Sequence, residues 1–159
     1  MLAGIFGVKS DTPTFPATIE EVLSKHPSCE LSRKYRAAQA SKATRARLDA
    51  ERQRLQAQRR RAQAVIDSAT PESDFAEVAR CQAEAEVVQK FLDRLDAEAR
   101  REGDNTSIAS FENVWAVYQL RVSNVVNHRE PGIRDTFNTN APPPPTLEDK
   151  IKAVQELLR

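Results

Sequence analysis

Apolar residues recur along most of this chain at the three- and four-residue steps that place them on one face of an α-helix. The clearest row predicts a helix that begins at Thr106 or Ser107 and ends before Pro131; its members are Ile108, Phe111, Trp115, Tyr118, Val122 and Val125. A second row predicts a helix over residues 73–102; its members are Phe75, Val78, Gln82, Ala85, Val88, Leu92, Leu95 and Ala99. These rows predict an all-α fold.

A third, longer helix is expected before these two. Residues 31–69 contain no Gly or Pro and are rich in Ala, Arg, Gln and Leu, which are good helix formers. Their apolar row repeats every seven residues, as in a coiled coil, and consists of Leu48, Leu55, Ala62 and Ala69. The following segment, Thr70-Pro71-Glu72, is so short that the two helices must run antiparallel. We therefore predict a long antiparallel helical hairpin with a third packed helix, the second helix being capped by Thr70 and ended by Gly103.

The two ends of the chain are predicted to be an extended arm and a tethered helix. Residues 1–17 hold prolines and glycines without a helical period, and a short helix capped by Thr18 follows over residues 19–24. Toward the C-terminus, the prolines at 142–145 form a stiff spacer, and Thr146 caps a final amphipathic helix. The expected organisation is an N-terminal arm over 1–17, a helical bundle over 18–130, a Pro-rich linker over 131–145 and a C-terminal helix over 146–159.

Charge divides the two long helices. Residues 31–69 carry 11 Lys and Arg against 3 Asp and Glu, whereas residues 73–102 carry 5 against 8. On a helical wheel, Arg45, Arg52 and Arg59 flank one side of the apolar row, and Arg47, Arg54 and Arg61 flank the other. These arginines are predicted to pair with acidic residues of the second helix, or else to contact an acidic partner surface or phosphate, for which the candidates are Arg45, Arg52, Arg59, Arg60 and Arg61.

The sequence offers few residues for catalysis or cofactor binding. It contains no phosphate-binding glycine loop and no nucleophile with a matching base, and its net charge is only +1. His26 and Cys29 have a ligand-like spacing, but a zinc site needs about four ligands, so we expect no metal and no cofactor. No stretch approaches the roughly 18 apolar residues of a membrane span, and Met1 to Val8 lack the features of a signal peptide. We expect a non-enzymatic protein that is cytoplasmic or part of a virus particle, with no membrane contact.

Apolar side chains at both ends of a helical body are typical of an assembly subunit. We expect this protein to bind neighbouring subunits of a larger complex, by analogy a virus or phage particle, and to be an oligomer. The expected contacts are Leu147, Ile151, Val154, Leu157 and Leu158 of the final helix and Leu2, Ile5 and Phe6 of the arm. The alternatives are a nucleic-acid-associated accessory protein that uses the arginine-rich helix, and a regulator that binds a partner enzyme through the final helix. Whether the two ends dock on their own chain or on a partner stays open.

Overall fold

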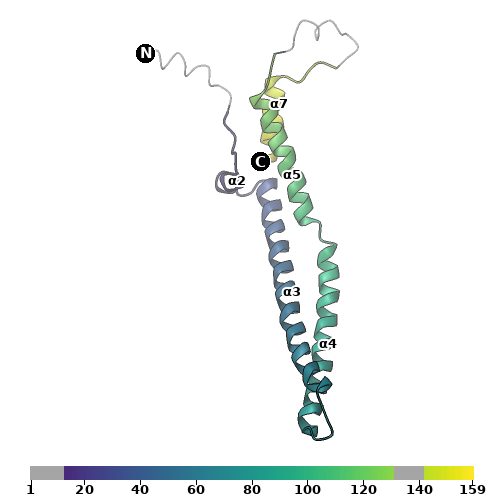
Figure 1. The fold of residues 1–159 in the computed structure, drawn as a ribbon. Coiled ribbons are helices and arrows are strands. Elements are labelled where there is room, and N and C mark those ends of the chain that lie inside the picture. The colour runs from purple at the N-terminus through teal and green to yellow at the C-terminus, as the bar shows by residue number, and fades with distance from the viewer. Residues whose placement is uncertain (1–12, 131–141) are drawn as a thin grey trace. The chain divides into compact units, whose positions relative to one another are not determined.

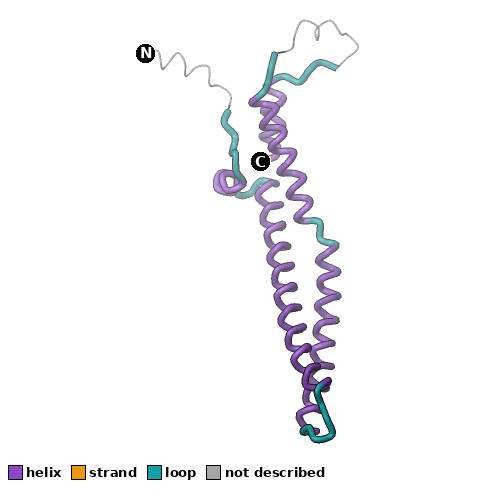
Figure 2. Tube along the Cα trace, viewed as in Figure 1, coloured by secondary structure: helices purple, strands orange, loops and turns teal. Residues whose placement is uncertain are grey.

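The computed structural model describes residues 13–130 and 142–159 and confirms the all-α fold (Figure 1). Its elements are α2 (Ile19–Lys25), α3 (Glu30–Asp67), α4 (Phe75–Gly103), α5 (Ser107–Val126) and α7 (Leu147–Leu157). In the described part of the chain only helices and loops occur (Figure 2). None of the described helices is long and apolar enough to cross a membrane.

Two of the helix starts are fixed by the caps that the sequence predicts. The Thr18 side chain accepts a hydrogen bond from the backbone N–H of Glu21 at the start of α2. At the start of α7, Thr146 and Asp149 form a full capping box, in which each side chain accepts a hydrogen bond from the other's backbone N–H. Both caps satisfy N–H groups that have no partner within the helix, and so they set where the helix begins.

The predicted ends of the second long helix were wrong by a few residues. Its N-cap is Asp74, whose carboxylate accepts from the N–H of Ala76, and not Thr70. Thr70 instead closes a turn with Ser73, donating its backbone N–H to the Ser73 hydroxyl. Gly103 is the last residue of α4 and not the residue that follows the helix. Asp104 caps the helix instead: its backbone has ordinary right-handed angles, and its N–H donates to the carbonyl oxygens of the last turn.

The described residues form two compact units. The first comprises residues 13–37, 109–130 and 142–159. Its buried core consists of Val22, Cys29, Leu31, Tyr118, Val125, Val154 and Leu157, and the half-buried side chains packed on it include Phe15, Trp115, Leu147, Ile151 and Leu158. The C-terminal helix α7 is thus a layer of this core, because its apolar side chains pack among those of α2, α3 and α5.

A row of aromatic rings runs beside this core. Tyr35 meets Phe111 edge-on at 5.2 Å between ring centroids, and the ring of Phe111 stacks on Trp115 at 6.3 Å. Trp115 in turn stacks on Tyr118 at 5.3 Å. Ring pairs at such distances stabilise a fold beyond the area they bury, so this row ties the start of α3 to α5.

The second unit, residues 38–108, is the antiparallel hairpin of α3 and α4. Its core cluster contains Leu48, Leu55, Val88, Leu92 and Leu95, with Ala99 packed against it. The predicted apolar row of α4 is therefore correct from Val88 to Ala99, whereas Gln82 is exposed. Phe75 was wrongly included in this row. It lies in the first turn of α4, and its side chain is 84% exposed.

Candidate protein-binding groove on the hairpin

Helix α4 carries two neighbouring apolar rows, and α3 covers only one of them. Val88, Leu92 and Leu95 are buried against α3. Val87 and Phe91 lie beside this row and remain 51% and 48% exposed. The apolar surface of α4 is wider than the apolar row of α3, so two helices alone leave part of it in water. Large exposed apolar side chains that lie together are typical of interaction sites.

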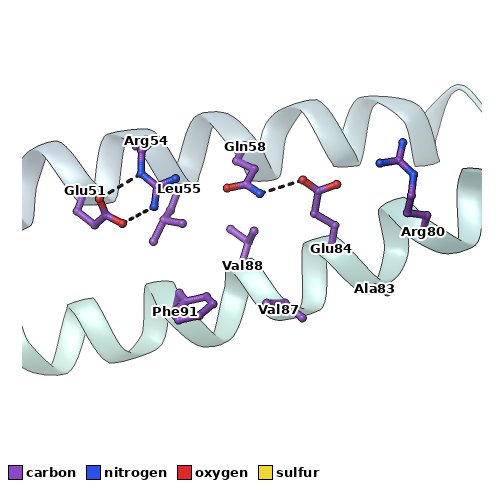
Figure 3. A pocket seen from close by; sticks show the side chains of 10 residues that line it. All are labelled: Glu51, Arg54, Leu55, Gln58, Arg80, Ala83, Glu84, Val87, Val88 and Phe91. Carbon is purple, nitrogen blue, oxygen red and sulfur yellow. Dashed lines mark hydrogen bonds and ion pairs between the residues drawn. The ribbon is translucent and has the colours of Figure 1, made fainter.

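These exposed side chains belong to a groove of about 480 Å³ between α3 and α4. Its lining residues are Glu51, Arg54, Leu55, Gln58, Arg80, Ala83, Glu84, Val87, Val88 and Phe91. Figure 3 shows Leu55, Val88 and Phe91 facing the space between the helices, with Glu51 at one end and Arg80 at the other. The groove therefore combines an apolar middle with ends that carry both signs of charge.

Glu51, Arg54 and Glu84 of the groove form hydrogen bonds with neighbouring side chains. The Nε of Arg54 donates to Glu51 at 3.1 Å, and this hydrogen bond lowers the pKa of the Glu51 carboxyl and raises that of the guanidinium. Gln58 donates to Glu84 across the helices at 2.9 Å. The guanidinium of Arg94 lies 5.7 Å from the centre of the Phe91 ring, within range of a cation–π contact. Glu51 therefore stays ionised at neutral pH, and the Phe91 ring has a cation beside it.

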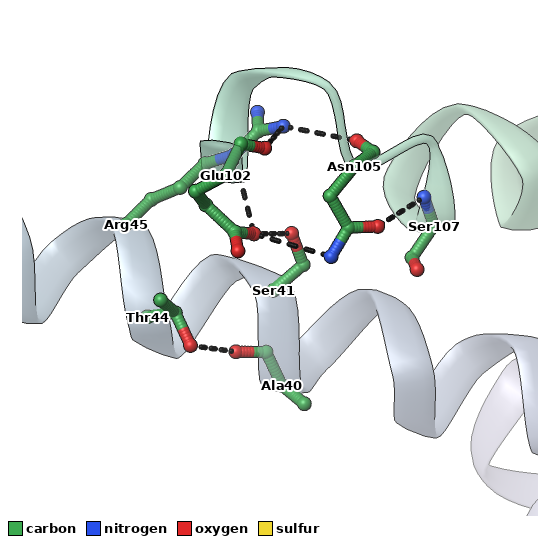
Figure 4. Close-up of polar contacts among 7 residues, drawn as sticks. All are labelled: Ala40, Ser41, Thr44, Arg45, Glu102, Asn105 and Ser107. Carbon is green, nitrogen blue, oxygen red and sulfur yellow. Dashed lines mark hydrogen bonds and ion pairs between the residues drawn. The ribbon is translucent and has the colours of Figure 1, made fainter. Parts of the chain in front are cut away.

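Ion pairs across the hairpin involve three of the predicted arginines. Arg52 binds Asp96 at 2.8 Å, Arg47 binds Glu98 at 3.2 Å, and Arg45 lies 3.9 Å from Glu102. Figure 4 shows the last of these, with Arg45 also donating to the carbonyl oxygens of Glu102 and Asn105. The Ser41 hydroxyl donates to the carboxylate of Glu102 as well.

The remaining arginines of the predicted set differ from these. Arg59, Arg60 and Arg61 are exposed, and none of them forms an ion pair with a described residue. Arg59 and Arg60 border a shallow hollow of about 430 Å³ together with Gln56 and Gln63. Three adjacent arginines without an ion pair among the described residues thus lie in the C-terminal part of α3.

The residues predicted to bind a partner through α7 lie in the core of their own chain. Val154 has no exposed surface, and Leu157 is buried. Arg121 of α5 also binds α7: it donates to the carbonyl oxygen of Ala153 at 2.9 Å and lies 3.8 Å from the carboxylate of Glu156. Docking on the chain's own bundle is one of the two arrangements that the sequence left open. The arm contacts Leu2, Ile5 and Phe6 lie outside the described residues.

His26 and Cys29 lie at the junction of α2 and α3, where their polar atoms are used locally. The Cys29 sulfur accepts from the backbone N–H of Ser32 at 3.4 Å, and the Ser32 hydroxyl donates to the carbonyl oxygen of His26 at 2.7 Å. In the part of the chain that the structure describes, no three His, Cys, Asp or Glu side chains gather into a metal-binding group. The spacing of these two residues therefore serves the start of α3.

Val87 and Phe91 are not among the site residues predicted from the sequence. A signal was present, because Ala83, Val87 and Phe91 form a second apolar row with four-residue steps beside the buried one. Periodicity shows that such a row exists but not whether a partner helix covers it. Only the packing of α3 distinguishes the covered row from the open one.

Comparisons of the chain with protein-family models, with curated proteins and with solved structures found no match.

Proposed function

We propose that this protein is a non-enzymatic structural subunit that assembles with neighbouring proteins through the α3–α4 groove, by accepting an amphipathic helix there. One observation carries the proposal: the half-exposed Phe91 beside Val87, held on a two-helix hairpin. Aromatic side chains, Phe among them, are enriched in the cores of protein interfaces relative to the rest of the surface. The apolar middle of the groove matches the apolar face of an amphipathic helix.

The groove supports this role better than the C-terminal helix does. For α7 to fill a partner's groove, Val154 and Leu157 would have to leave the core of their own unit. That would expose them and the surfaces of α2 and α5 that they cover, and uncovering a core side chain costs roughly 1.5–3 kcal/mol. The α3–α4 groove is already open, so binding there needs no such rearrangement.

The test is site-specific photo-crosslinking in the cells that naturally make the protein. A photoreactive phenylalanine replaces Phe91 in one variant and Phe75, an exposed phenylalanine of the same helix outside the groove, in the other. We expect crosslinked polypeptides from position 91 and few from position 75. The crosslinked peptide identifies which chain occupies the groove. Equal yields at the two positions, or none at position 91, would rule the groove out as an assembly site.

A second candidate function, contact with nucleic-acid phosphate, is favoured by one observation. Arg59, Arg60 and Arg61 are adjacent, exposed and without an ion-pair partner among the described residues. If they bind a duplex oligonucleotide, the logarithm of the affinity should fall with the logarithm of salt concentration at a slope of about −0.9 per phosphate contacted. Replacing all three by Gln should reduce that slope by about 3. Absence of binding even at low salt would eliminate this candidate.

A further inference from the structure

We propose that the groove is occupied by the hairpin of a second copy of this protein, packed antiparallel, so that two hairpins form a four-helix bundle. The inference deepens the function proposed above and rests on it. Two hairpins placed face to face bury the apolar rows that each leaves open, and four antiparallel helices are a common stable arrangement. The shape and the charge of the groove both fit an inverted copy of the same groove.

The shape of α4 is self-complementary about Val87. Phe91 lies four residues after Val87 and Ala83 lies four residues before it, and all three line the groove. A two-fold axis that crosses the helices at Val87 therefore places the Phe91 ring of one copy over the Ala83 of the other. A large side chain then meets a small one at both symmetric positions, as close packing between helices requires.

The charges follow the same symmetry. Glu51 lies at one end of the groove, where it is paired with Arg54 of its own helix, and Arg80 lies at the other end (Figure 3), where no described residue forms an ion pair with it. The same two-fold axis brings the Glu51 end of one copy to the Arg80 end of the other. An antiparallel copy therefore brings the unpaired Arg80 of each chain to the end of the groove that holds the Glu51 of the other.

A parallel copy fits much less well. It would place Phe91 against Phe91, Glu51 against Glu51 and Arg80 against Arg80. Two large rings would then compete for one space, while Ala83 would face Ala83 across a gap. Like charges that face each other across an interface oppose association. The groove therefore favours a second copy packed antiparallel over one packed parallel.

The first test measures the mass of the purified full-length chain by light scattering and analytical ultracentrifugation over a range of concentrations. We expect a dimer, and we expect Phe91→Ala to raise its Kd at least about a hundredfold, because one truncation removes two symmetric anchors. Phe75→Ala is the matched control and should leave the Kd unchanged. A chain that is monomeric throughout, or a dimer indifferent to Phe91→Ala, would overturn the inference.

A second pair of variants tests where the Phe91 ring packs, without shortening the Phe91 side chain. Ala83 is exposed in the single chain, so Ala83→Lys should preserve the helical circular dichroism spectrum. It should nevertheless block the partner's Phe91 and abolish dimerisation. Ala64→Lys, at an exposed alanine of α3 outside the groove, should have no effect on the dimer. Unchanged dimerisation of Ala83→Lys would show that Phe91 packs elsewhere.

The direction of the copies is tested by charge exchange. Glu51→Arg and Arg80→Glu should each weaken the homodimer by about tenfold, because each turns two attractive contacts into repulsive ones. Mixed together, the two variants should form a heterodimer of nearly wild-type affinity, since each copy then carries the charge that the other needs. Failure of the mixture to recover affinity would contradict the antiparallel register.

Failure of this inference and failure of the proposed function give different results. If the groove serves assembly but not self-association, the purified chain is monomeric, while photo-crosslinking at position 91 captures a peptide of another protein. That outcome overturns the second-copy inference alone. If position 91 yields no more crosslinked product than position 75, both are overturned. A crosslink from position 91 to a peptide of α4 containing Ala83 supports both.

Discussion

The hydroxyl of Tyr118 donates a 2.6 Å hydrogen bond to the backbone carbonyl oxygen of Pro16, which lies 102 positions earlier in the chain. Tyr118 is 1% exposed, and Pro16 is buried as well. This contact ties the segment before α2 to the middle of α5. It also shows why residues 13–17 belong to a folded unit although they contain no regular secondary structure.

The first prediction follows from this hydrogen bond. Tyr118→Phe should lower the free energy of unfolding by about 1–3 kcal/mol at neutral pH, because the buried carbonyl of Pro16 loses its donor. Chemical denaturation followed by circular dichroism measures the change. Tyr35→Phe is a control for the loss of a hydroxyl at a tyrosine that is less buried. A Tyr118→Phe variant as stable as wild type would show that the hydrogen bond contributes nothing.

The same tyrosine predicts a loss of stability at alkaline pH. Burial raises the pKa of Tyr118 to about 12, with the nearby Glu21 and Cys29 adding to the effect. In the unfolded chain the pKa is near 10, so the folded state retains the proton longer. Stability is therefore complete below pH 10 and falls by up to about 2–3 kcal/mol between pH 10 and 12. In Tyr118→Phe this pH-dependent loss of stability should be absent. Unfolding curves of the variant and of the wild type, compared at each pH, measure the difference.

The docked position of α7 predicts that the C-terminus contributes to stability. Val154→Ala should lower the free energy of unfolding by on the order of 2 kcal/mol, because it leaves a cavity in a fully buried site. Gln155→Ala, at an exposed position of the same helix, should change it by less than about 0.5 kcal/mol. Deleting residues 142–159 should destabilise the first unit more than Val154→Ala does. Equal stability of the two point variants would mean that α7 is not packed in solution.

The capping box of α7 predicts an acid-sensitive helix start. The hydrogen bond from the Thr146 backbone N–H lowers the pKa of Asp149. Because the folded pKa lies below the unfolded one, the contribution to stability is present above about pH 4 and is lost as the pH falls through the folded value. Asp149→Asn should remove this pH dependence. NMR titration of the Asp149 carboxyl measures the pKa directly, and an ordinary value would contradict the prediction.

The ion pairs between α3 and α4 predict a small interaction free energy across the hairpin. A double-mutant cycle on Arg52 and Asp96 should give an interaction free energy of about 0.2–1 kcal/mol, because both side chains are partly exposed to water. Arg59→Ala should be nearly neutral for stability, since Arg59 has no ion-pair partner among the described residues. High salt should reduce the coupling of the pair. A coupling of zero at low salt would show that the arginines of α3 do not contribute to the pairing of the two helices.

Much of the secondary structure could be predicted from the sequence because its determinants are local. The three-and-four spacing of Trp115, Tyr118 and Val122 makes α5 amphipathic, and Thr18 and Thr146 cap the helices that follow them. Where two local signals competed, the prediction was wrong. Thr70 followed by Pro71 resembled a helix start, but Asp74 could cap the helix and leave the earlier residues to form the turn.

The candidate site depended on tertiary structure and could not be found in this way. The sequence determined that α4 has an apolar surface, that α3 is basic and that α7 is amphipathic, because spacing and composition alone decide these properties. Only the packing of the helices decided that Val154 is buried in its own chain while Val87 and Phe91 face water. The physical reason is that the burial of a side chain depends on the surface packed against it. The width of the apolar row on α3 sets how much of α4 is covered, and the residues of α4 do not determine that width.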